Sequence, residues 1–123
     1  MIARKPAAVG WAQAWPWTEE NLRDCFERAD LVVDCTSACL TPEGDDAFTA
    51  SLPFDALPTG AAVATLIYHR KTNLLERATG LGHSTLDGRA MLVHQGARAF
   101  AIWAGTPAPI EVMTRALDAS LAR

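Results

Sequence analysis

The segment Leu31-Val32-Val33-Asp34-Cys35-Thr36 is a short apolar run rich in β-branched residues, and Ala61 to Tyr68 forms a second run of this kind. Strands that are buried on both faces have this composition, because neither face needs polar side chains. We therefore expect two strands that are covered on both faces. Since helical patterns flank both runs, the sequence predicts an α/β layer fold with a mainly parallel sheet.

The first strand is preceded by a predicted helix and followed by a predicted loop. Thr18 can accept hydrogen bonds from the free N–H groups at the start of a helix spanning Glu19 to Arg28. The segment from Ser37 to Gly60 is rich in Pro, Gly, Asp and Thr, which favours a loop. Near the N-terminus, the alternating segment Val9 to Trp15 predicts a strand with one buried face.

A short helix and a short strand are expected after the second run. Thr72 can cap this helix, which Gly80 or Gly82 ends. A brief strand over His83 to Leu86 follows.

The C-terminal third predicts two longer helices. The first opens at Asp87-Gly88 and runs to about Ala104, and the second follows the break at Gly105-Thr106-Pro107. We expect an apolar stripe on the first helix, made of Leu92, Gly96, Ala99, Phe100 and Trp103. Three of its residues are expected to face outward: His94, Arg98 and Ala101. The second helix has one apolar face, made of Ile110, Met113, Leu117 and Leu121.

Length and composition exclude several classes of protein. The 123 residues, half of them hydrophobic and a fifth charged, are expected to form one domain over residues 1–123. The net charge of −3 without a basic block argues against nucleic-acid binding. No run approaches the ~20 apolar residues of a membrane span, and no signal peptide is recognised. We therefore expect a cytoplasmic protein without a membrane partner.

The cysteines and histidines do not form a metal-binding pattern. Cys25, Cys35 and Cys39 are odd in number, contain no C-x-x-C, and lie among apolar neighbours, so we expect reduced, buried thiols. The three histidines share no ligand spacing with one another or with cysteine, so no zinc site is expected.

Four segments, in order, resemble the shikimate dehydrogenases. The first is Ala29 to Ser37, which is similar to the family pattern A-D-L-V-V-N-A-T-S. The second is Leu66-Ile67-Tyr68 with Thr72 to Ala78, which is similar to a strand ending in Tyr followed by T-x-L-L-x-x-A. The third is Leu86 to Gln95 (D-G-x-x-M-L-V-x-Q), and the fourth is Phe100 to Gly105 (F-x-x-W-x-G) with Val112-Met113 downstream. The match covers Ala29 to about Leu117. Each motif alone is weak, but their order and gaps make the resemblance specific.

The resemblance is to the C-terminal, NADP-binding part of this family, whose enzymes interconvert 3-dehydroshikimate and shikimate in aromatic amino-acid biosynthesis. It implies a partial Rossmann-like three-layer sandwich with a small, mainly parallel sheet and C-terminal helices. The family's N-terminal substrate domain, which holds its catalytic Lys–Asp pair, has no counterpart in the sequence. The glycine-rich turn that binds the pyrophosphate has none either.

The resemblance also implies roles for five residues. Gln95 would bind a substrate hydroxyl, and Tyr68 would contact substrate through its own hydroxyl. Backbone atoms of Leu66 and Gly88 would line the nicotinamide, and Arg4 would meet the 2′-phosphate of NADP. The residues alone leave structural alternatives open: an edge glutamine that caps a backbone group for Gln95, a packed aromatic ring for Tyr68, and a structural use for Leu66 and Gly88.

Several residues depart from the family pattern. Asp34 replaces Asn, which would place a negative charge near the cofactor path, and Cys39 replaces Gly. Thr65 replaces the Asp of D-x-x-Y, and His69-Arg70 replaces a polar-Pro pair. Arg70-Lys71 can be interpreted as a phosphate clamp, but adjacent basic residues in a loop are usually solvated.

Two hypotheses follow. The first is a fragment or truncated homologue of NADP-dependent shikimate dehydrogenase that is inactive alone and is completed by an N-terminal domain or chain. The second is a non-catalytic binding or assembly module on a degenerate half-Rossmann scaffold. Because the strand at residues 31–36 would lie at a sheet edge, we also expect either cover by the Val9–Trp15 segment or a homodimer. The dimer would form through that edge or through the C-terminal helices.

Overall fold

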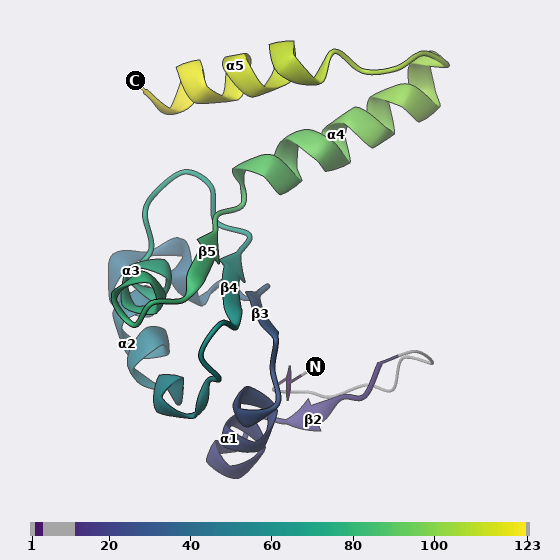
Figure 1. The fold of residues 1–123 in the computed structure, drawn as a ribbon. Helices are drawn as coiled ribbons and strands as arrows, with labels where there is room; N and C mark the ends of the chain where they lie inside the picture. The colour runs from purple at the N-terminus through teal and green to yellow at the C-terminus, as the bar shows by residue number, and fades with distance from the viewer. Residues whose placement is uncertain (1, 4–11, 123) are drawn as a thin grey trace.

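The computed structural model describes residues 2–3 and 12–122, and Figure 1 shows its ribbon. The strands are β1 (Ile2–Ala3), β2 (Trp15–Pro16), β3 (Leu31–Asp34), β4 (Ala62–Thr65) and β5 (Ser84–Leu86). The α-helices are α1 (Glu19–Glu27), α2 (Pro42–Ala50), α3 (Asn73–Gly80), α4 (Arg89–Ala104) and α5 (Ile110–Leu121). Two 3₁₀ turns are η1 (Ala38–Leu40) and η2 (Phe54–Ala56).

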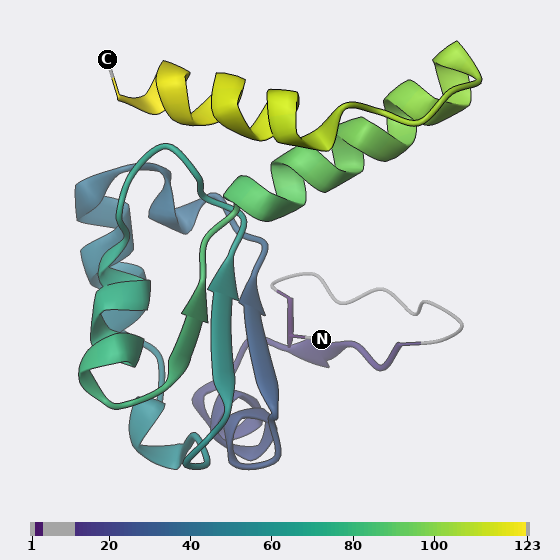
Figure 2. The same cartoon turned by 45° about the horizontal axis from the view of Figure 1, so that its top comes forward.

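A three-stranded parallel sheet in the order β3-β4-β5 forms the centre of the fold (Figure 2). Val32 is the register partner of Val63, and Val63 is the partner of Thr85. Helical segments connect β3 to β4 and β4 to β5, as parallel pairing requires. The expected α/β class, the parallel sheet and the C-terminal helices are therefore confirmed.

Among the residues that the structure describes, helices cover one face of this sheet. Helices α2 and α3 lie together on one side of the sheet (Figures 1 and 2), where Val63 and Leu74 are fully buried. The core on that side also includes residues of α1, η1, η2 and the connecting loops: Leu22, Phe26, Cys39, Leu52, Phe54, Leu57, Ala61, Ile67 and Ala78.

The opposite face of the sheet is open. Leu31 and Val33 of β3 are 53% and 45% exposed, and Leu86 of β5 is 58% exposed. The expectation that both strands are covered on both faces is therefore wrong for β3. The apolar composition of β3 is that of a doubly covered strand, but no helix among the described residues packs on this face.

The helix starts follow the predicted capping residues. The Thr18 side chain accepts a hydrogen bond from the Asn21 N–H, and the Thr72 side chain accepts one from the Leu75 N–H. Both strands predicted from the apolar runs are shorter than expected, because pairing ends at Asp34 and Thr65.

The segment from Ser37 to Gly60 is largely helical rather than a loop. Thr41 caps α2 by accepting a hydrogen bond from the Gly44 N–H, and Pro42 occupies the first turn, where a missing N–H costs nothing. The loop prediction relied on a composition of weak helix formers. The cap and the packing of α2 against α3 overcome that weak propensity.

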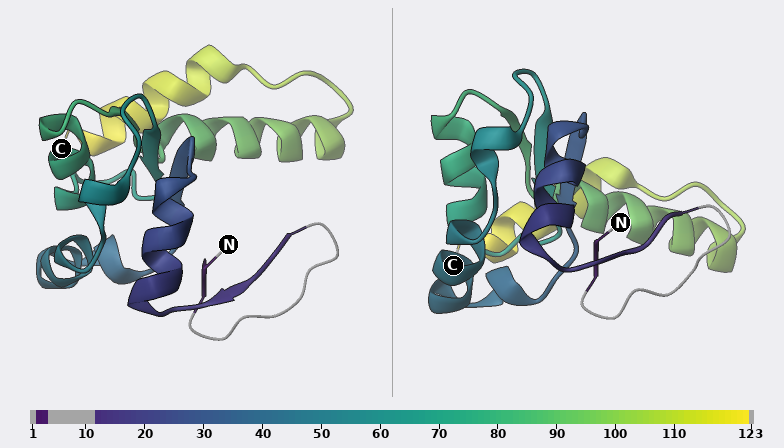
Figure 3. Two further views of the ribbon diagram at one scale, coloured as in Figure 1. Left: turned by 60° about the horizontal axis from the view of Figure 1, so that its bottom comes forward. Right: turned by 90° about the horizontal axis from the view of Figure 1, so that it is seen from below.

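Helix α4 runs away from the sheet, and α5 returns alongside it in the antiparallel direction (Figures 1 and 3). An added Cβ at Gly96 would lie 3.3 Å from Cε of Met113, so α5 packs closely on α4 at this point. The expected stripe on α4 is partly wrong, because Val93 and Ala97 are buried while Phe100 and Trp103 are exposed. Within residues 2–3 and 12–122, α5 and the sheet end cover α4, and the buried face is rotated by about one residue from the expected stripe.

The N-terminal segment does not replace the missing edge strand in the described residues. Trp15–Pro16 pairs in parallel with Ile2–Ala3 as a separate two-stranded sheet, not with β3. The rest of the expected strand, including Val9 and Trp11, lies outside the described residues.

Candidate functional site

The carboxyl end of β4 meets the start of α4 through backbone atoms. The Gly88 N–H donates to the Ile67 carbonyl at 2.9 Å. A Cβ built on Gly88 would lie 2.1 Å from the Leu66 carbonyl oxygen. Because Gly88 has an ordinary φ of −75°, the close approach, not the backbone conformation, requires glycine here. The structure thus brings Leu66 and Gly88 together at the sheet edge where α/β folds bind ligands.

Tyr68 lies just beyond this contact and is 39% exposed. Its ring makes an edge contact with His69, with 5.6 Å between the ring centroids. Tyr68 also borders a hollow of about 470 Å³, which Lys71, Arg89 and Leu121 help to line. Tyr68 therefore presents its ring at the carboxyl end of the sheet, close in sequence to the Leu66–Gly88 contact.

Gln95 is exposed on α4, about two turns beyond Gly88. Its Nε2 donates to the Leu92 carbonyl at 3.1 Å. Seven residues of helix separate Gln95 from Gly88, which is roughly 10 Å along the axis. In the described part of the chain no hydrogen bond joins Gln95 to Tyr68, so the structure does not bring these two together by direct contact. Arg4 lies outside the described residues.

Of the two basic residues Arg70 and Lys71, Arg70 is bonded into the fold, whereas the Lys71 side chain is exposed as expected of a solvated residue. Arg70 donates to the carbonyls of Cys39, Thr41 and Lys71, and its Nη2 lies 2.7 Å from Oδ2 of Asp45. Lys71 pairs with Glu76 at 2.9 Å. Since Arg70 already uses its donors within the protein, the solvated interpretation is wrong for Arg70.

Asp45 is the fully buried centre of this network, and the sequence interpretation missed it. Its carboxylate also accepts hydrogen bonds from the backbone N–H groups of Asn73 and Leu74 and from the Thr49 hydroxyl. Burial raises the pKa of Asp45, but the hydrogen bonds from Asn73, Cys39, Arg70 and Leu74 outweigh burial and hold that pKa below its ordinary value. Asp45 therefore joins α2 to the loop after Tyr68 and to the start of α3.

The three thiols differ in burial. Cys39 is fully buried, Cys25 is half-buried and Cys35 is exposed, so the expectation of three buried cysteines holds only for Cys39. Cys35 follows the last paired residue of β3, where the chain leaves the sheet. Burial, together with the nearby Asp34 carboxylate, raises the pKa of the Cys39 thiol, which keeps it protonated.

Residues 2–3 and 12–122 contain neither a metal-ligand cluster nor a membrane-spanning helix. No group of three or more His, Cys, Asp or Glu side chains there could hold a metal ion. None of the helices in these residues has the length and apolar character needed to cross a membrane.

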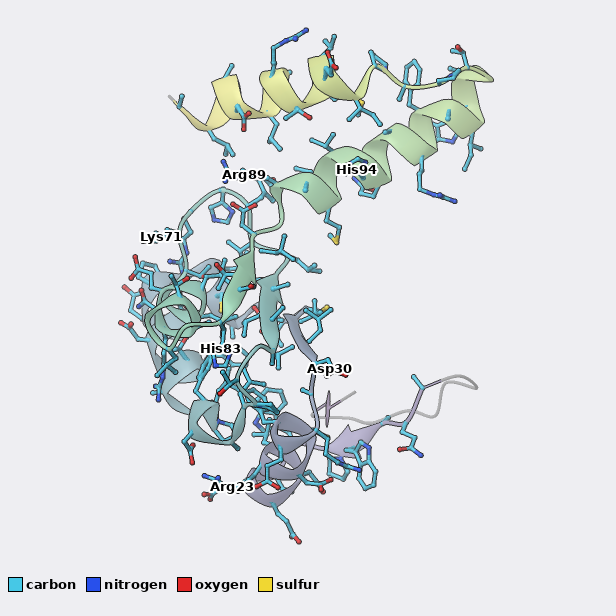
Figure 4. All side chains as sticks on the ribbon, in the orientation of Figure 1. Arg23, Asp30, Lys71, His83, Arg89 and His94 are labelled. Atoms are coloured by element: carbon cyan, nitrogen blue, oxygen red, sulfur yellow. The ribbon has the colours of Figure 1, made fainter. Side chains whose placement is uncertain are left out.

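Arg89 lies at the start of α4, where the last turns of α5 approach (Figure 4). Its guanidinium contacts Asp87 at 2.7 Å and Asp118 of α5 at 3.9 Å. These contacts join the sheet end, α4 and α5 around the Gly88 position. The parallel sheet and its backbone-lined carboxyl edge together define a Rossmann-like α/β domain.

Comparison with known proteins shows which Rossmann-like proteins this chain is similar to. The family model for the shikimate 5′-dehydrogenase C-terminal domain matches residues 88–117. Shikimate dehydrogenase (NADP(+)) of Desulforamulus reducens is 37% identical over 109 residues, and that of Thermosynechococcus vestitus is 40% identical over 111 residues. These matches cover 88% and 85% of this chain but 37% and 36% of the relatives.

Solved structures give the same result. Shikimate 5-dehydrogenase of Listeria monocytogenes, in complex with shikimate and NAD, matches with a TM-score of 0.74 and 30% identity over 86% of this chain and 37% of that one. The Thermus thermophilus enzyme in complex with NADP(H) and shikimate matches with a TM-score of 0.66 and 29% identity over the same shares. The chain is similar to the C-terminal part of these shikimate dehydrogenases and spans a little over a third of their length.

Proposed function

We propose that the chain supplies the nicotinamide-side and substrate-hydroxyl contacts of an NADP-dependent shikimate dehydrogenase, and that it is inactive without the rest of such an enzyme. The observation that carries this proposal is the Gly88–Leu66 approach. A side chain at position 88 would overlap the Leu66 carbonyl, so only a glycine leaves this backbone surface flat. The relatives named for NADP(+) support the choice of cofactor.

The residues present fit one end of NADP better than the other. Leu66 and Gly88 would hold the nicotinamide, and Arg4 would meet the 2′-phosphate. The sequence contains no G-x-G-x-x-G turn for the pyrophosphate. When bound, NADP supplies the hydride acceptor or donor. This chain's own part is to orient the substrate through Gln95 and Tyr68, which would bind its hydroxyl groups.

The test is a shikimate oxidation assay with NADP⁺, using the chain alone and co-expressed with the N-terminal part of the Thermosynechococcus vestitus enzyme. We expect no turnover from the chain alone and turnover from the pair. Gln95→Ala should then lower kcat/KM by up to about tenfold, since a hydrogen bond to a neutral hydroxyl contributes roughly 0.5–1.5 kcal/mol. His94→Ala, at the neighbouring exposed position, is the matched control. Turnover by the chain alone would contradict the proposal.

The alternative is a non-catalytic binding or assembly module. One observation favours it: Cys39 and Arg70, two departures from the family pattern, both contact Asp45 inside the fold. These positions now stabilise the scaffold. If the chain and the co-expressed N-terminal part assemble but show neither turnover nor NADP⁺ binding, the result would support this alternative.

The proposal also names two binding partners and a cellular compartment. The missing part of the enzyme is the first expected partner. A homodimer is the second, because α4 and α5 expose Ile102, Trp103 and Val112 at 78%, 86% and 53%. The proposed compartment is the cytoplasm, where free thiols such as the exposed Cys35 stay reduced.

A further inference from the structure

The loop that carries Tyr68 is not held by its own backbone. It connects β4 to α3 at the carboxyl end of the sheet (Figure 2). Among the described residues, no backbone group of Tyr68, His69 or Arg70 forms a hydrogen bond with another backbone group. The nearest backbone anchor on the β4 side is the Ile67 carbonyl, which accepts from the Gly88 N–H at 2.9 Å.

The Tyr68 side chain also has few contacts of its own. Its ring is 39% exposed and makes an edge contact with the ring of His69. In the described part of the chain, the Tyr68 hydroxyl forms no hydrogen bond. The position of this hydroxyl therefore depends on the backbone that carries the ring.

Arg70 supplies the bonds that fix this backbone. Its Nε and Nη2 donate to the Cys39 carbonyl at 3.2 and 2.9 Å, and Nη2 also donates to the Thr41 carbonyl at 3.2 Å. Its Nη1 donates to the Lys71 carbonyl within the loop at 3.1 Å. The guanidinium also lies 2.7 Å from the carboxylate of Asp45, whose side chain is fully buried, while the Arg70 side chain is 22% exposed. The middle of the loop is therefore bound to the start of α2 through partly buried contacts.

Asp45 fixes the far end of the same loop. Its carboxylate accepts from the N–H groups of Asn73 and Leu74 at 2.7 and 3.2 Å. In the shikimate dehydrogenase pattern a proline stands at the position of Arg70, and a proline ring restricts the backbone directly. In this chain the side chain of Arg70, paired with Asp45, restricts the loop instead.

We infer that Arg70 is a positioning residue, which holds the loop so that the Tyr68 hydroxyl meets a hydroxyl of the substrate. This inference rests on the proposed function, which assigns that substrate contact to Tyr68. The planar fork of a guanidinium can bind several carbonyls and a carboxylate together, whereas a lysine ammonium is a point charge. Arg70→Lys therefore keeps the charge opposite Asp45 and removes most of the bonds that fix the loop.

The first test measures the loop in this chain alone, by NMR relaxation of the backbone amides. In the unchanged chain, the order parameters of Tyr68 and Lys71 should lie near about 0.85, the value of rigid backbone. In Arg70→Lys they should fall below about 0.6. Arg77→Lys is the matched control and should leave both values unchanged, because the Arg77 guanidinium lies over the Phe54 ring and not in the loop.

A second variant covers the case in which Arg70→Lys does not fold. Arg70→Ala combined with Asp45→Asn leaves no buried charge without a partner. The amide oxygen of the asparagine can still accept from the start of α3. The same fall in the order parameters of Tyr68 and Lys71 is expected.

The second test is a double-mutant cycle in the shikimate oxidation assay, with the chain co-expressed with the N-terminal part of the Thermosynechococcus vestitus enzyme. Arg70→Lys should lower kcat/KM by about threefold to tenfold, and by no more than Tyr68→Phe does. In the Tyr68→Phe background, Arg70→Lys should change kcat/KM less than about twofold, because no hydroxyl is left to position. A role in the fold alone would give the same loss in both backgrounds.

The outcomes separate this inference from the proposed function. Order parameters of Tyr68 that do not change in Arg70→Lys overturn the inference, and so do equal losses of kcat/KM in both backgrounds. In either case, turnover by the unchanged chain with its partner leaves the proposed function standing. If that pair shows no turnover, the proposed function fails, and the relaxation measurement alone decides whether Arg70 holds Tyr68.

Discussion

The Thr65 hydroxyl donates a hydrogen bond to Oδ2 of Asp34 over 3.1 Å, across the parallel pair of β3 and β4. The two residues are register partners, and both are buried. They also occupy two positions where the chain departs from the pattern of the shikimate dehydrogenases, which have Asn and Asp there. The hydrogen bond therefore links the two positions at which the sequence differs from the family pattern.

The Asp34 carboxylate is expected to stabilise the fold rather than face the cofactor path. Its Oδ1 accepts from the Thr36 N–H at 2.8 Å, and its Oδ2 from Thr65. Asp34→Ala should destabilise the protein by about 2–4 kcal/mol, because two hydrogen bonds to a charged group are lost. Asp34→Asn should cost less than about 1 kcal/mol, since its amide can serve both partners. Urea unfolding measures both, and equal losses would contradict this role.

Asp45 should make the stability depend on pH in the acid range. Its folded pKa is lower than the ordinary value of 3.8, so its contribution is complete above about pH 5. It is lost as the pH falls below 3.8 through the lowered folded pKa, because the unfolded chain binds the proton first. Unfolding midpoints from pH 6 to pH 2 should therefore fall more steeply for the unchanged protein than for Asp45→Asn.

At neutral pH, Asp45→Ala should cost about 3–5 kcal/mol, because it leaves Arg70 without its buried partner. Glu43→Gln, an exposed change on the same helix, is the control and should shift stability by less than about 0.5 kcal/mol. Equal effects of the two substitutions would show that the Asp45 network does not stabilise the fold.

Gly88→Ala tests the backbone contact at the site. The added methyl carbon would lie 2.1 Å from the Leu66 carbonyl oxygen, so the start of α4 must shift. We expect a loss of about 1–3 kcal/mol, typical of overpacking. Gly80→Ala is the matched control, because nothing lies within 4 Å of its added Cβ. Thermal unfolding of both variants measures the difference, and an unchanged Gly88→Ala midpoint would refute the contact.

The chain alone should bind NADP⁺ weakly. Each backbone hydrogen bond lost from the pyrophosphate is worth about 1.5–3 kcal/mol. Two such losses weaken binding by roughly two orders of magnitude or more, at about 1.4 kcal/mol per decade. Isothermal titration calorimetry with NADP⁺ measures this, and a Kd in the low micromolar range would show the reasoning wrong.

Light scattering at several concentrations should show a homodimer of the chain alone. Trp103→Glu, which places a charge on the exposed end of α4, should shift it toward a 13.2 kDa monomer if the dimer forms through α4 and α5. His94→Glu, a similar charge change elsewhere on α4, is the control. A monomer at every concentration would rule out the homodimer.

Local signals predicted the helix starts well. Thr18 and Thr72 are capping residues whose effect depends only on the next three residues, and both accept the expected bonds. The same signal, Thr41 followed by Pro42, could have located α2. The Gly and Asp residues after it pointed the other way.

Long-range contacts were not readable from local patterns. The carboxylate of Asp45 meets Arg70 from 25 residues away, and neither residue lies in a spacing that indicates the pair. The close approach of Gly88 to Leu66 was not predicted, since a lone glycine before a helix predicts only a turn. The family resemblance implied only that backbone atoms of each residue would line the nicotinamide. The exposed face of β3 could not be foreseen, because an apolar strand has the same composition whether or not its cover is present.

The strand order β3-β4-β5 has a consequence for how the chain assembles. Strands that are neighbours in the sheet are also consecutive in the chain, so each new strand adds beside the one just formed. Each pairing still joins residues on either side of a helical connection, as Val32 and Val63 are, so the sheet grows one connection at a time. During synthesis, β3 and β4 can pair before α4 and α5 have left the ribosome.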